Sequence, residues 1–189
     1  PINAKIILSV RRLVPMMGHQ HILRAFAIAV SQTQEDLVLI LHHYLGKNVE
    51  YEIMLRNLAD DLGIYSNIVW LDEITDDQMP ELYSLADIVV NFPDYDGLPV
   101  SFFEAAACKK PIITNDLEAY NQILSQGNFT IVPAGDIDQL ATAIKKVVET
   151  PEKEMQLTLQ KNYELIVRIA DQNHCISQLE QIYSRFSAK

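Results

Sequence analysis

The chain consists of short apolar runs that alternate with segments of helical spacing. The apolar runs are rich in β-branched residues, which is typical of strands buried on both faces of a sheet. The intervening segments repeat their apolar residues with the period of amphipathic helices. The predicted strands are 5–10, 36–43, 67–70, 87–92, 111–114 and 129–132. The predicted helices are 21–30, 51–62, 76–86, 100–108, 117–125, 137–147 and a charged helical stretch from about 152 to 187.

The strict alternation of strand and helix predicts a Rossmann-like, doubly wound α/β domain, with a parallel six-stranded sheet and helices on both faces. We expect residues 1–150 to form this domain. Residues 151–189 should form a C-terminal helical segment that packs on it, or on a domain absent from this chain. In the common strand order the first and fourth strands are neighbours, and ligands bind beyond their carboxyl ends. A binding site is therefore expected at the loops 11–18 and 92–99.

Composition limits the classes of function. The formal net charge is −10 without a basic stripe, which argues against a protein that binds the phosphate backbone of nucleic acids. No apolar run approaches the roughly 18 residues that a membrane span needs. Cys108 and Cys175 lack metal-type spacing and are interpreted as reduced thiols of a cytoplasmic protein. The chain begins with Pro-Ile and without Met, which suggests a piece of a longer protein.

The loop after strand 87–92 leads into a helix with the features of an anion site. The helix should begin near Pro99 or Val100, where free N–H groups attract phosphate. Glu104, one turn further, suits hydroxyls such as a ribose diol. Asp96 would lie on the other side of the anion, beside a second polyhydroxylated group. The alternative is that Asp96 caps the helix and Glu104 is a solvated surface residue.

The first loop begins with two arginines. Arg11 and Arg12 follow strand 5–10, and one of two consecutive residues at a strand end faces the crevice. A guanidinium at that place suits a diphosphate, whereas the alternative is a pair of solvated arginines.

The histidines do not predict a metal site. Pairs occur at His19 and His21 and at His42 and His43, but no acidic or cysteine partner lies at ligand spacing. We therefore expect no metal.

Three stretches, "SVRRLVPMMG", "DGLPVSFFEAAACKKPIIT" and "FTIVPAGDIDQLATAI", together resemble the C-terminal, donor-binding half of a GT-B glycosyltransferase. The resemblance is closest to the retaining family-4 enzymes, the glycosyl transferases group 1. In that family a strand is followed by Gly-Arg-Leu-x-x-x-Lys-Gly, and later by Glu-Gly-Phe-Gly-Leu with a second Glu eight residues after the first. The similarity covers about residues 5 to 148, and the last helices resemble the segment that crosses back to the partner domain.

The resemblance implies roles for residues around the phosphates. Arg12 matches the arginine that grips the donor diphosphate, and Arg11 beside it takes the family's Gly position. Gly97, Leu98 and the amide of Val100 match the turn that cradles the phosphate.

It also implies roles for the acids. Asp96 stands where the first Glu contacts the hydroxyls of the donor sugar, and Glu104 matches the second Glu, which holds the ribose. These two are the expected catalytic carboxylates. Asp72, Glu73 and Ile74 match the loop beside the nucleobase.

The chain departs from the family pattern at four further positions. Met17 stands where the family has its Lys, and the loss of such a charged contact costs about 1.5–3 kcal/mol. Arg11 is a candidate to compensate for it. Lys109 replaces a Gly and Gln122 a Glu, and Asp96 is one methylene shorter than Glu.

The function implied by the resemblance is donor binding in a transferase of polysaccharide biosynthesis. The substrate would be a nucleoside diphosphate sugar, such as a UDP- or GDP-sugar, used without a metal or cofactor. The acceptor, a glycan or lipid-linked saccharide, would bind an absent N-terminal domain, which also leaves room for a peripheral membrane association. Two alternatives remain, namely a non-catalytic glycosyltransferase-like scaffold domain and a GT-B-type nucleotide-sugar epimerase.

Overall fold

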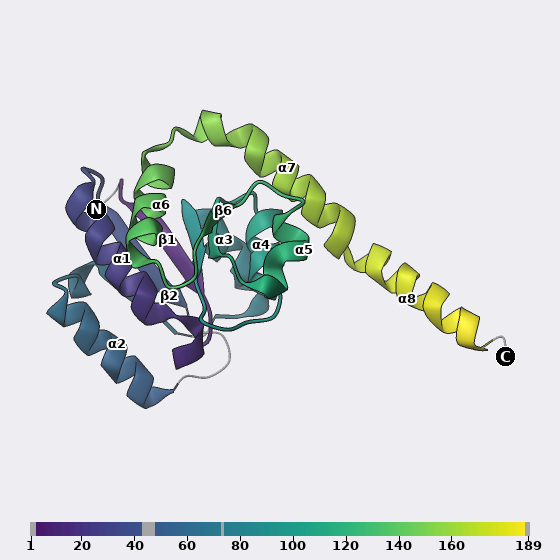
Figure 1. Cartoon of the computed structure of the whole chain (residues 1–189), viewed down its shortest axis with the longest axis horizontal. Coiled ribbons are helices and arrows are strands. Elements are labelled where there is room, and N and C mark those ends of the chain that lie inside the picture. Colours follow the sequence, from purple (N-terminus) through teal and green to yellow (C-terminus); the bar gives the residue numbers. More distant parts are fainter. Residues whose placement is uncertain (1–2, 43–47, 73, 188–189) are drawn as a thin grey trace.

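The computed structural model describes residues 3–42, 48–72 and 74–187. Within these residues, six parallel strands form one sheet in the order β3-β2-β1-β4-β5-β6 (Figure 1). This order is the doubly wound topology that the sequence predicts. The strands are β1 Lys5–Val10, β2 Leu37–His42, β3 Ile68–Leu71, β4 Ile88–Asn91, β5 Ile112–Asn115 and β6 Thr130–Val132.

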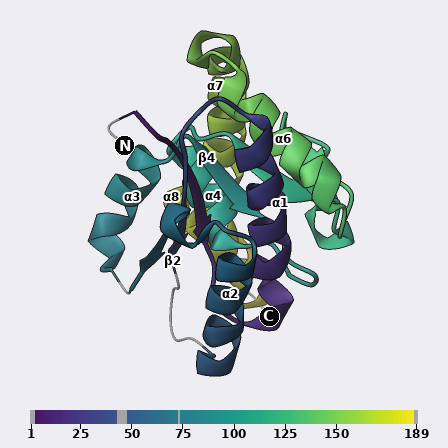
Figure 2. The ribbon, with the colours of Figure 1, turned by 90° about the vertical axis from the view of Figure 1, so that its left-hand side faces the viewer.

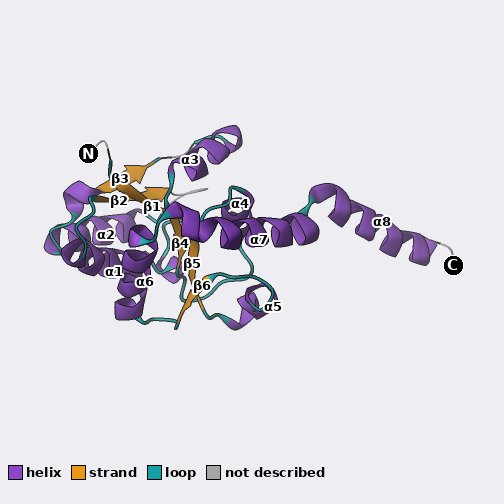
Figure 3. Cartoon of the chain, turned by 90° about the horizontal axis from the view of Figure 1, so that it is seen from above, coloured by secondary structure: helices purple, strands orange, loops and turns teal. Residues whose placement is uncertain are grey.

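Helices cover both faces of this sheet, as Figures 2 and 3 show from two directions. One face carries α1 (His19–Gln32), α2 (Val49–Asp61) and α6 (Ile137–Glu149). The other carries α3 (Met79–Leu85), α4 (Val100–Ala107), α5 (Asn121–Leu124) and α7 (Glu152–Ala170). Successive strand residues alternate between the two hydrophobic cores, so that Ile7 packs into the first and Leu8 into the second.

Several helix boundaries differ from the predicted ones. The predicted helix 76–86 begins as a 3-10 turn at Asp76–Gln78, and the predicted helix 117–125 divides into a 3-10 turn, Glu118–Tyr120, and α5. The predicted stretch 152–187 is two helices, because Asp171 has an extended backbone and ends α7. Its carboxylate then accepts a hydrogen bond of 2.9 Å from the N–H of His174, which caps α8 (Gln172–Ser187).

The two C-terminal helices relate differently to the domain. α7 buries Leu165 and Ile166 in the second core and packs along α4. α8 projects away from the sheet (Figure 1) and leaves apolar side chains such as Leu179 and Phe186 exposed. Of the helices that the structure describes, none has the length and apolar character to cross a bilayer. The proposed division at residue 150 stays a prediction.

The loops that follow β1 and β4 are in direct contact. Gly18 has a φ of +69°, and a Cβ on it would lie 2.0 Å from the carbonyl oxygen of Phe92. Beside it, the N–H of Asp94 donates to the carbonyl of Met16 at 2.9 Å. Only glycine fits this position, because it tolerates both the left-handed backbone and the close approach. The contact brings the two loops together at the carboxyl ends of their strands.

Candidate functional site

A cavity of about 560 Å³ opens at the carboxyl end of β1, next to the start of α4. The expected loop 11–18 borders on it, together with the start of α4 and the segment after β3, whereas no residue of the expected loop 92–99 is part of the lining. Its lining residues are Val10, Arg11, Arg12, Met17, Asp76, Met79, Val100, Ser101 and Glu104.

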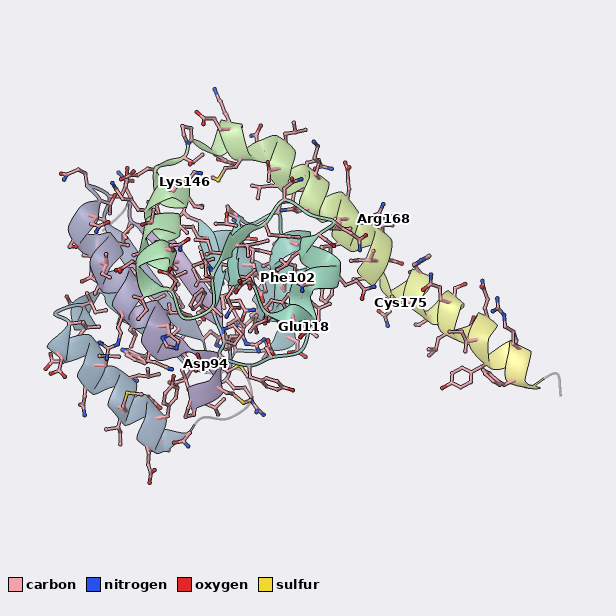
Figure 4. The ribbon with its side chains drawn as sticks, viewed as in Figure 1. Asp94, Phe102, Glu118, Lys146, Arg168 and Cys175 are labelled. Atoms are coloured by element: carbon pink, nitrogen blue, oxygen red, sulfur yellow. The ribbon has the colours of Figure 1, made fainter. Side chains whose placement is uncertain are left out.

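The start of α4 faces this cavity. The helix begins at Val100, and no side chain caps its N-terminal residue Pro99. Val100 and Ser101 both line the cavity, so the free N–H groups of the first turn are available to an anion there. The helix is anchored by Phe102, which is labelled in Figure 4. This side chain is buried and packs on Phe129 with 4.7 Å between ring centroids. The predicted helix start is confirmed, and Asp96 does not cap it.

Glu104 lies one turn further along α4 and also lines the cavity. Its Oε2 accepts a hydrogen bond of 2.8 Å from the hydroxyl of Tyr83 in α3. Burial raises the pKa of Tyr83 above its ordinary value, and the charge of Glu104 raises it further, so the phenol stays protonated and donates. Glu104 is half-buried and has no ion pair with the described residues. It is not a freely solvated helix residue.

Asp96 has a different environment. Its Oδ2 accepts a hydrogen bond of 2.6 Å from Nη2 of Arg11 and one of 2.7 Å from the hydroxyl of Tyr120. The hydroxyl of Tyr120 accepts in turn from Nδ2 of Asn91 at 3.1 Å. Asp96 is not among the residues that line the cavity, whereas Arg11 is. Of this ion pair, Arg11 therefore belongs to the lining of the cavity and Asp96 does not.

The other expected phosphate contacts are partly at the cavity. Arg12 is exposed and lines it, and Val100 does so as well. Gly97 and Leu98 are not among the lining residues. A Cβ on Gly97 would meet no protein atom within 4 Å, so nothing within the described protein requires a glycine there.

The segment after β3 reaches the cavity later than predicted. Asp72 and Ile74 do not line it, and Glu73 lies outside the described residues. Asp76 and Met79, at the 3-10 turn and the start of α3, take this place. The turn is set by a capping box between Thr75 and Gln78, whose spacing is the sequence signal that marks this boundary.

The histidines do not gather at the cavity. Within the described part of the chain, no group of three or more His, Cys, Asp or Glu side chains is placed to hold a metal ion. His19 is buried, and desolvation lowers its pKa to about 3, so it is neutral at physiological pH. His21 bonds Asp94, which is labelled in Figure 4, at 2.8 Å. His42 lies in β2 with Nδ1 3.2 Å from the carbonyl oxygen of Asp72, and His43 is outside the described residues.

Residue patterns alone did not single out the two tyrosines that bond the acids. Tyr83 and Tyr120 occupy apolar positions of helical segments and are almost fully buried, so their rings are indistinguishable in the sequence from ordinary core residues. Asp96 and Glu104 were the available signal for such donors, because a half-buried carboxylate needs hydrogen-bond donors.

The sequence was compared with known families and curated proteins. The family model for glycosyl transferases group 1 matches residues 1–164. The GDP-mannose-dependent alpha-(1-6)-phosphatidylinositol monomannoside mannosyltransferase of Mycolicibacterium smegmatis is 24% identical over 157 residues, which are 78% of this chain and 40% of that protein. The O-antigen chain mannosyltransferase RfbU of Salmonella typhimurium is 27% identical over 104 residues, 54% of this chain and 29% of that protein. The chain thus spans less than half the length of either relative.

Solved structures share the fold. Sucrose-phosphate synthase from Thermosynechococcus elongatus aligns with the whole chain and 47% of its own, with a TM-score of 0.84 and 20% identity. HepE from Anabaena, solved with UDP and glucose, aligns with 99% of this chain and 49% of its own, with a TM-score of 0.81 and 20% identity. The C-terminal domain of the group 1 protein LpcC from Francisella tularensis aligns over 88% of this chain and 87% of its own, with a TM-score of 0.74 and 18% identity.

Proposed function

Because this chain belongs to the glycosyl transferases group 1 family, we propose that it is the donor-binding domain of a retaining glycosyltransferase. Its substrate would be a nucleoside diphosphate sugar, from which the complete enzyme transfers the sugar to a saccharide or lipid-linked acceptor. The mannosyltransferase relative is GDP-mannose-dependent and HepE was solved with UDP, so both bases are candidates.

One observation carries the proposal. Arg12, the uncapped start of α4 and Glu104 line the same cavity. A guanidinium and free helix N–H groups attract a diphosphate, but a carboxylate repels it. Glu104 therefore needs a ligand with hydroxyl groups next to its phosphates, and a nucleoside diphosphate provides both.

The described residues suggest an orientation for the nucleotide. The diphosphate would lie between Arg12 and the first turn of α4, and the ribose hydroxyls would donate to Glu104. Asp76 and Met79, which also line the cavity, would then be next to the base. Direct contact between Asp96 and the donor sugar stays a prediction, as do contacts from Gly97, Leu98, Asp72 and Ile74.

The chemistry follows from this placement. When the bond from the sugar to the diphosphate breaks, negative charge grows on the leaving phosphate, and Arg12 and the N–H groups of α4 are in place to stabilise it. No metal is needed for that stabilisation in this proposal. The acceptor would approach from a second domain that this chain does not contain, on the face of the sugar that the phosphate leaves. We place the enzyme in the cytosol, where the free thiols of Cys108 and Cys175 stay reduced.

Calorimetric titration of the protein with UDP and with GDP tests the proposal, with inorganic phosphate as the matched ligand that lacks a ribose. Binding of one nucleotide that is much tighter than that of phosphate would support it. Absence of heat with either nucleotide would favour a scaffold role, for which Met17 in place of the family's Lys is the motivating observation. A panel of nucleotide sugars offered to the full-length enzyme would identify the donor. Consumption of that donor in the absence of an acceptor would indicate an epimerase.

A further inference from the structure

The guanidinium of Arg11 is held along one edge. Its Nη2 donates to Oδ2 of Asp96 at 2.6 Å and contacts the sulfur of Met17 at 2.9 Å, while Nε lies 3.2 Å from the same sulfur. The other terminal nitrogen, Nη1, has no hydrogen-bond acceptor among the described residues. The side chain is only 12% exposed and lines the cavity together with Arg12. Arg11 thus has one edge fixed by the protein and the opposite nitrogen left for a ligand.

Arg11 is the outermost member of a series of hydrogen bonds whose inner members are buried. Asp96 accepts from Arg11 and from Tyr120, and Tyr120 accepts from Asn91 at the end of β4. Tyr120 is 0% exposed and Asn91 is 3% exposed. Burial raises the pKa of Tyr120 above its ordinary value and the bond to Asp96 raises it further, so this phenol remains a donor. Each group in this hydrogen-bonded series restricts the orientation of the next one, from Asn91 in the sheet to the guanidinium of Arg11.

This arrangement is poorly explained by stability alone. Removing an ion pair from water costs about as much free energy as its Coulomb attraction returns, so such a pair adds little net stability. Its geometric effect is larger, because a flexible arginine is confined to one orientation before a ligand arrives.

We propose that Arg11 is a second diphosphate-binding cation of this site, and that Asp96, Tyr120 and Asn91 are positioning residues that hold it. The inference rests on the proposed function and names the contacts of the same site. Arg12 and Arg11 would each donate to one phosphate group, and the start of α4 would complete the anion site. Met17 contributes its sulfur to hold the guanidinium, where a lysine would contribute a charge of its own. Asp96 then acts on the diphosphate through Arg11.

The first test compares Arg11→Gln with the wild-type chain on two ligands, by calorimetry and ligand-observed NMR. We expect the affinity for UDP or GDP to fall about 10- to 100-fold, because a charged hydrogen bond to phosphate is lost. The affinity for uridine or guanosine, which lack phosphate, should change less than about twofold. Arg24→Gln, at an exposed arginine of α1, is the matched control and should leave both affinities unaltered.

Folding is controlled with a second variant, because Arg11→Gln leaves Asp96 without its cation. The double variant Arg11→Gln/Asp96→Asn removes both charges, and we expect the same loss of nucleoside diphosphate affinity from it. If either folded variant binds UDP and GDP as the wild-type chain does, Arg11 does not contact the diphosphate and the inference is wrong.

The second test separates positioning from simple packing. Tyr120→Phe should weaken nucleoside diphosphate binding about threefold, the share of one hydrogen bond, and leave nucleoside binding unaltered. Tyr51→Phe, which loses a part-buried hydrogen bond to Gln20 at a residue that does not line the cavity, is the matched control and should change neither. In the Arg11→Gln background, Tyr120→Phe should have no further effect on binding, because it acts through Arg11.

Two outcomes distinguish failure of this inference from failure of the proposed function. A wild-type chain that binds neither UDP nor GDP overturns the proposed function and this inference with it. A wild-type chain that binds, combined with a Tyr120→Phe effect that persists undiminished without Arg11, leaves the proposed function intact and overturns the positioning role.

Discussion

The carboxylates of Asp96 and Glu104 each bond a tyrosine, but only Glu104 lines the cavity. Each accepts one hydrogen bond from a buried tyrosine, Glu104 from Tyr83 at 2.8 Å and Asp96 from Tyr120 at 2.7 Å. Asp96 also has a cation, Arg11 at 2.6 Å, whereas the described residues provide none for Glu104.

The difference shows how a counter-charge decides the role of an acid. Asp96 and Arg11 are both largely buried, at 14% and 12% exposure, and they satisfy one another inside the protein. Glu104 faces the cavity with a single neutral donor, so its remaining lone pairs need water or a ligand. We therefore expect Asp96 to matter more for stability and Glu104 more for binding.

Replacement of Asp96 should have the largest effect. Asp96→Ala leaves the guanidinium of Arg11 poorly solvated and without a counter-charge, and we expect the free energy of unfolding to fall by about 2–3 kcal/mol. This is below the usual cost for a fully buried pair, because both side chains retain some contact with solvent. Urea denaturation measures it, and Asp94→Ala in the same loop is the matched control, since Asp94 is half exposed and pairs with His21. A similar loss from both variants would contradict the comparison.

Replacement of Glu104 should act on binding instead. Glu104→Ala removes the acceptor for the ribose hydroxyls, and we expect the affinity for UDP or GDP to fall about 10- to 100-fold. The melting temperature should stay unchanged, because Glu104 has no ion pair with the described residues. Glu81→Ala, at an exposed position of α3, is the control. If Glu104→Ala binds the nucleotide as the wild-type chain does, Glu104 is a solvated surface residue without a role in binding.

The sequence predicted the fold to the level of strand order. Parallel strands buried on both faces produce uniformly apolar runs, and their alternation with helices leaves few topologies. The break between α7 and α8 was not predicted, because Asp171 interrupts a pattern that is otherwise continuously helical. The local hydrogen bonds of an Asp side chain compete with the backbone hydrogen bonds of a helix. The periodicity of apolar residues does not show which of the two prevails.

The candidate site was predictable in its residues more than in their partners. Arg12, Val100 and Glu104 line the cavity as expected from strand ends and helix starts. The pairing of Arg11 with Asp96 joins residues 85 positions apart and depends on side-chain orientation, which spacing does not encode. The hydroxyls of Tyr83 and Tyr120 were missed for the same reason, since only their rings contribute to the apolar pattern.

Tyr83 and Tyr120 should have similar effects on the stability of the protein at alkaline pH. Both have a pKa raised above the ordinary value near 10, chiefly by burial. A phenol with a raised folded-state pKa binds its proton more tightly in the folded protein. Its stabilising contribution is complete below pH 10 and is lost as the pH rises toward the folded-state pKa.

Above roughly pH 10, each tyrosine should therefore lower the free energy of unfolding by about 1.4 kcal/mol per pH unit. Urea denaturation between about pH 9 and 11.5 measures this slope, and Tyr83→Phe and Tyr120→Phe should each remove one share. Tyr51, whose pKa burial raises to about 12, provides a third phenol for comparison, at a residue that does not line the cavity. A slope that is the same in all three Phe variants and in the wild-type chain would show that these phenols do not titrate as argued.

The smallest expected effect is that of Tyr83→Phe on binding at neutral pH. The change removes the donor that orients Glu104 but leaves the carboxylate in place, so we expect nucleoside diphosphate affinity to fall about threefold to fivefold. Combined with Glu104→Ala, it should cause no further loss, because Tyr83 acts on the ligand only through that carboxylate. Calorimetry on the single and double variants measures both. An additive loss in the double variant would mean that Tyr83 contacts the nucleotide itself, and the parallel with Tyr120 and Asp96 would then fail at this end of the site.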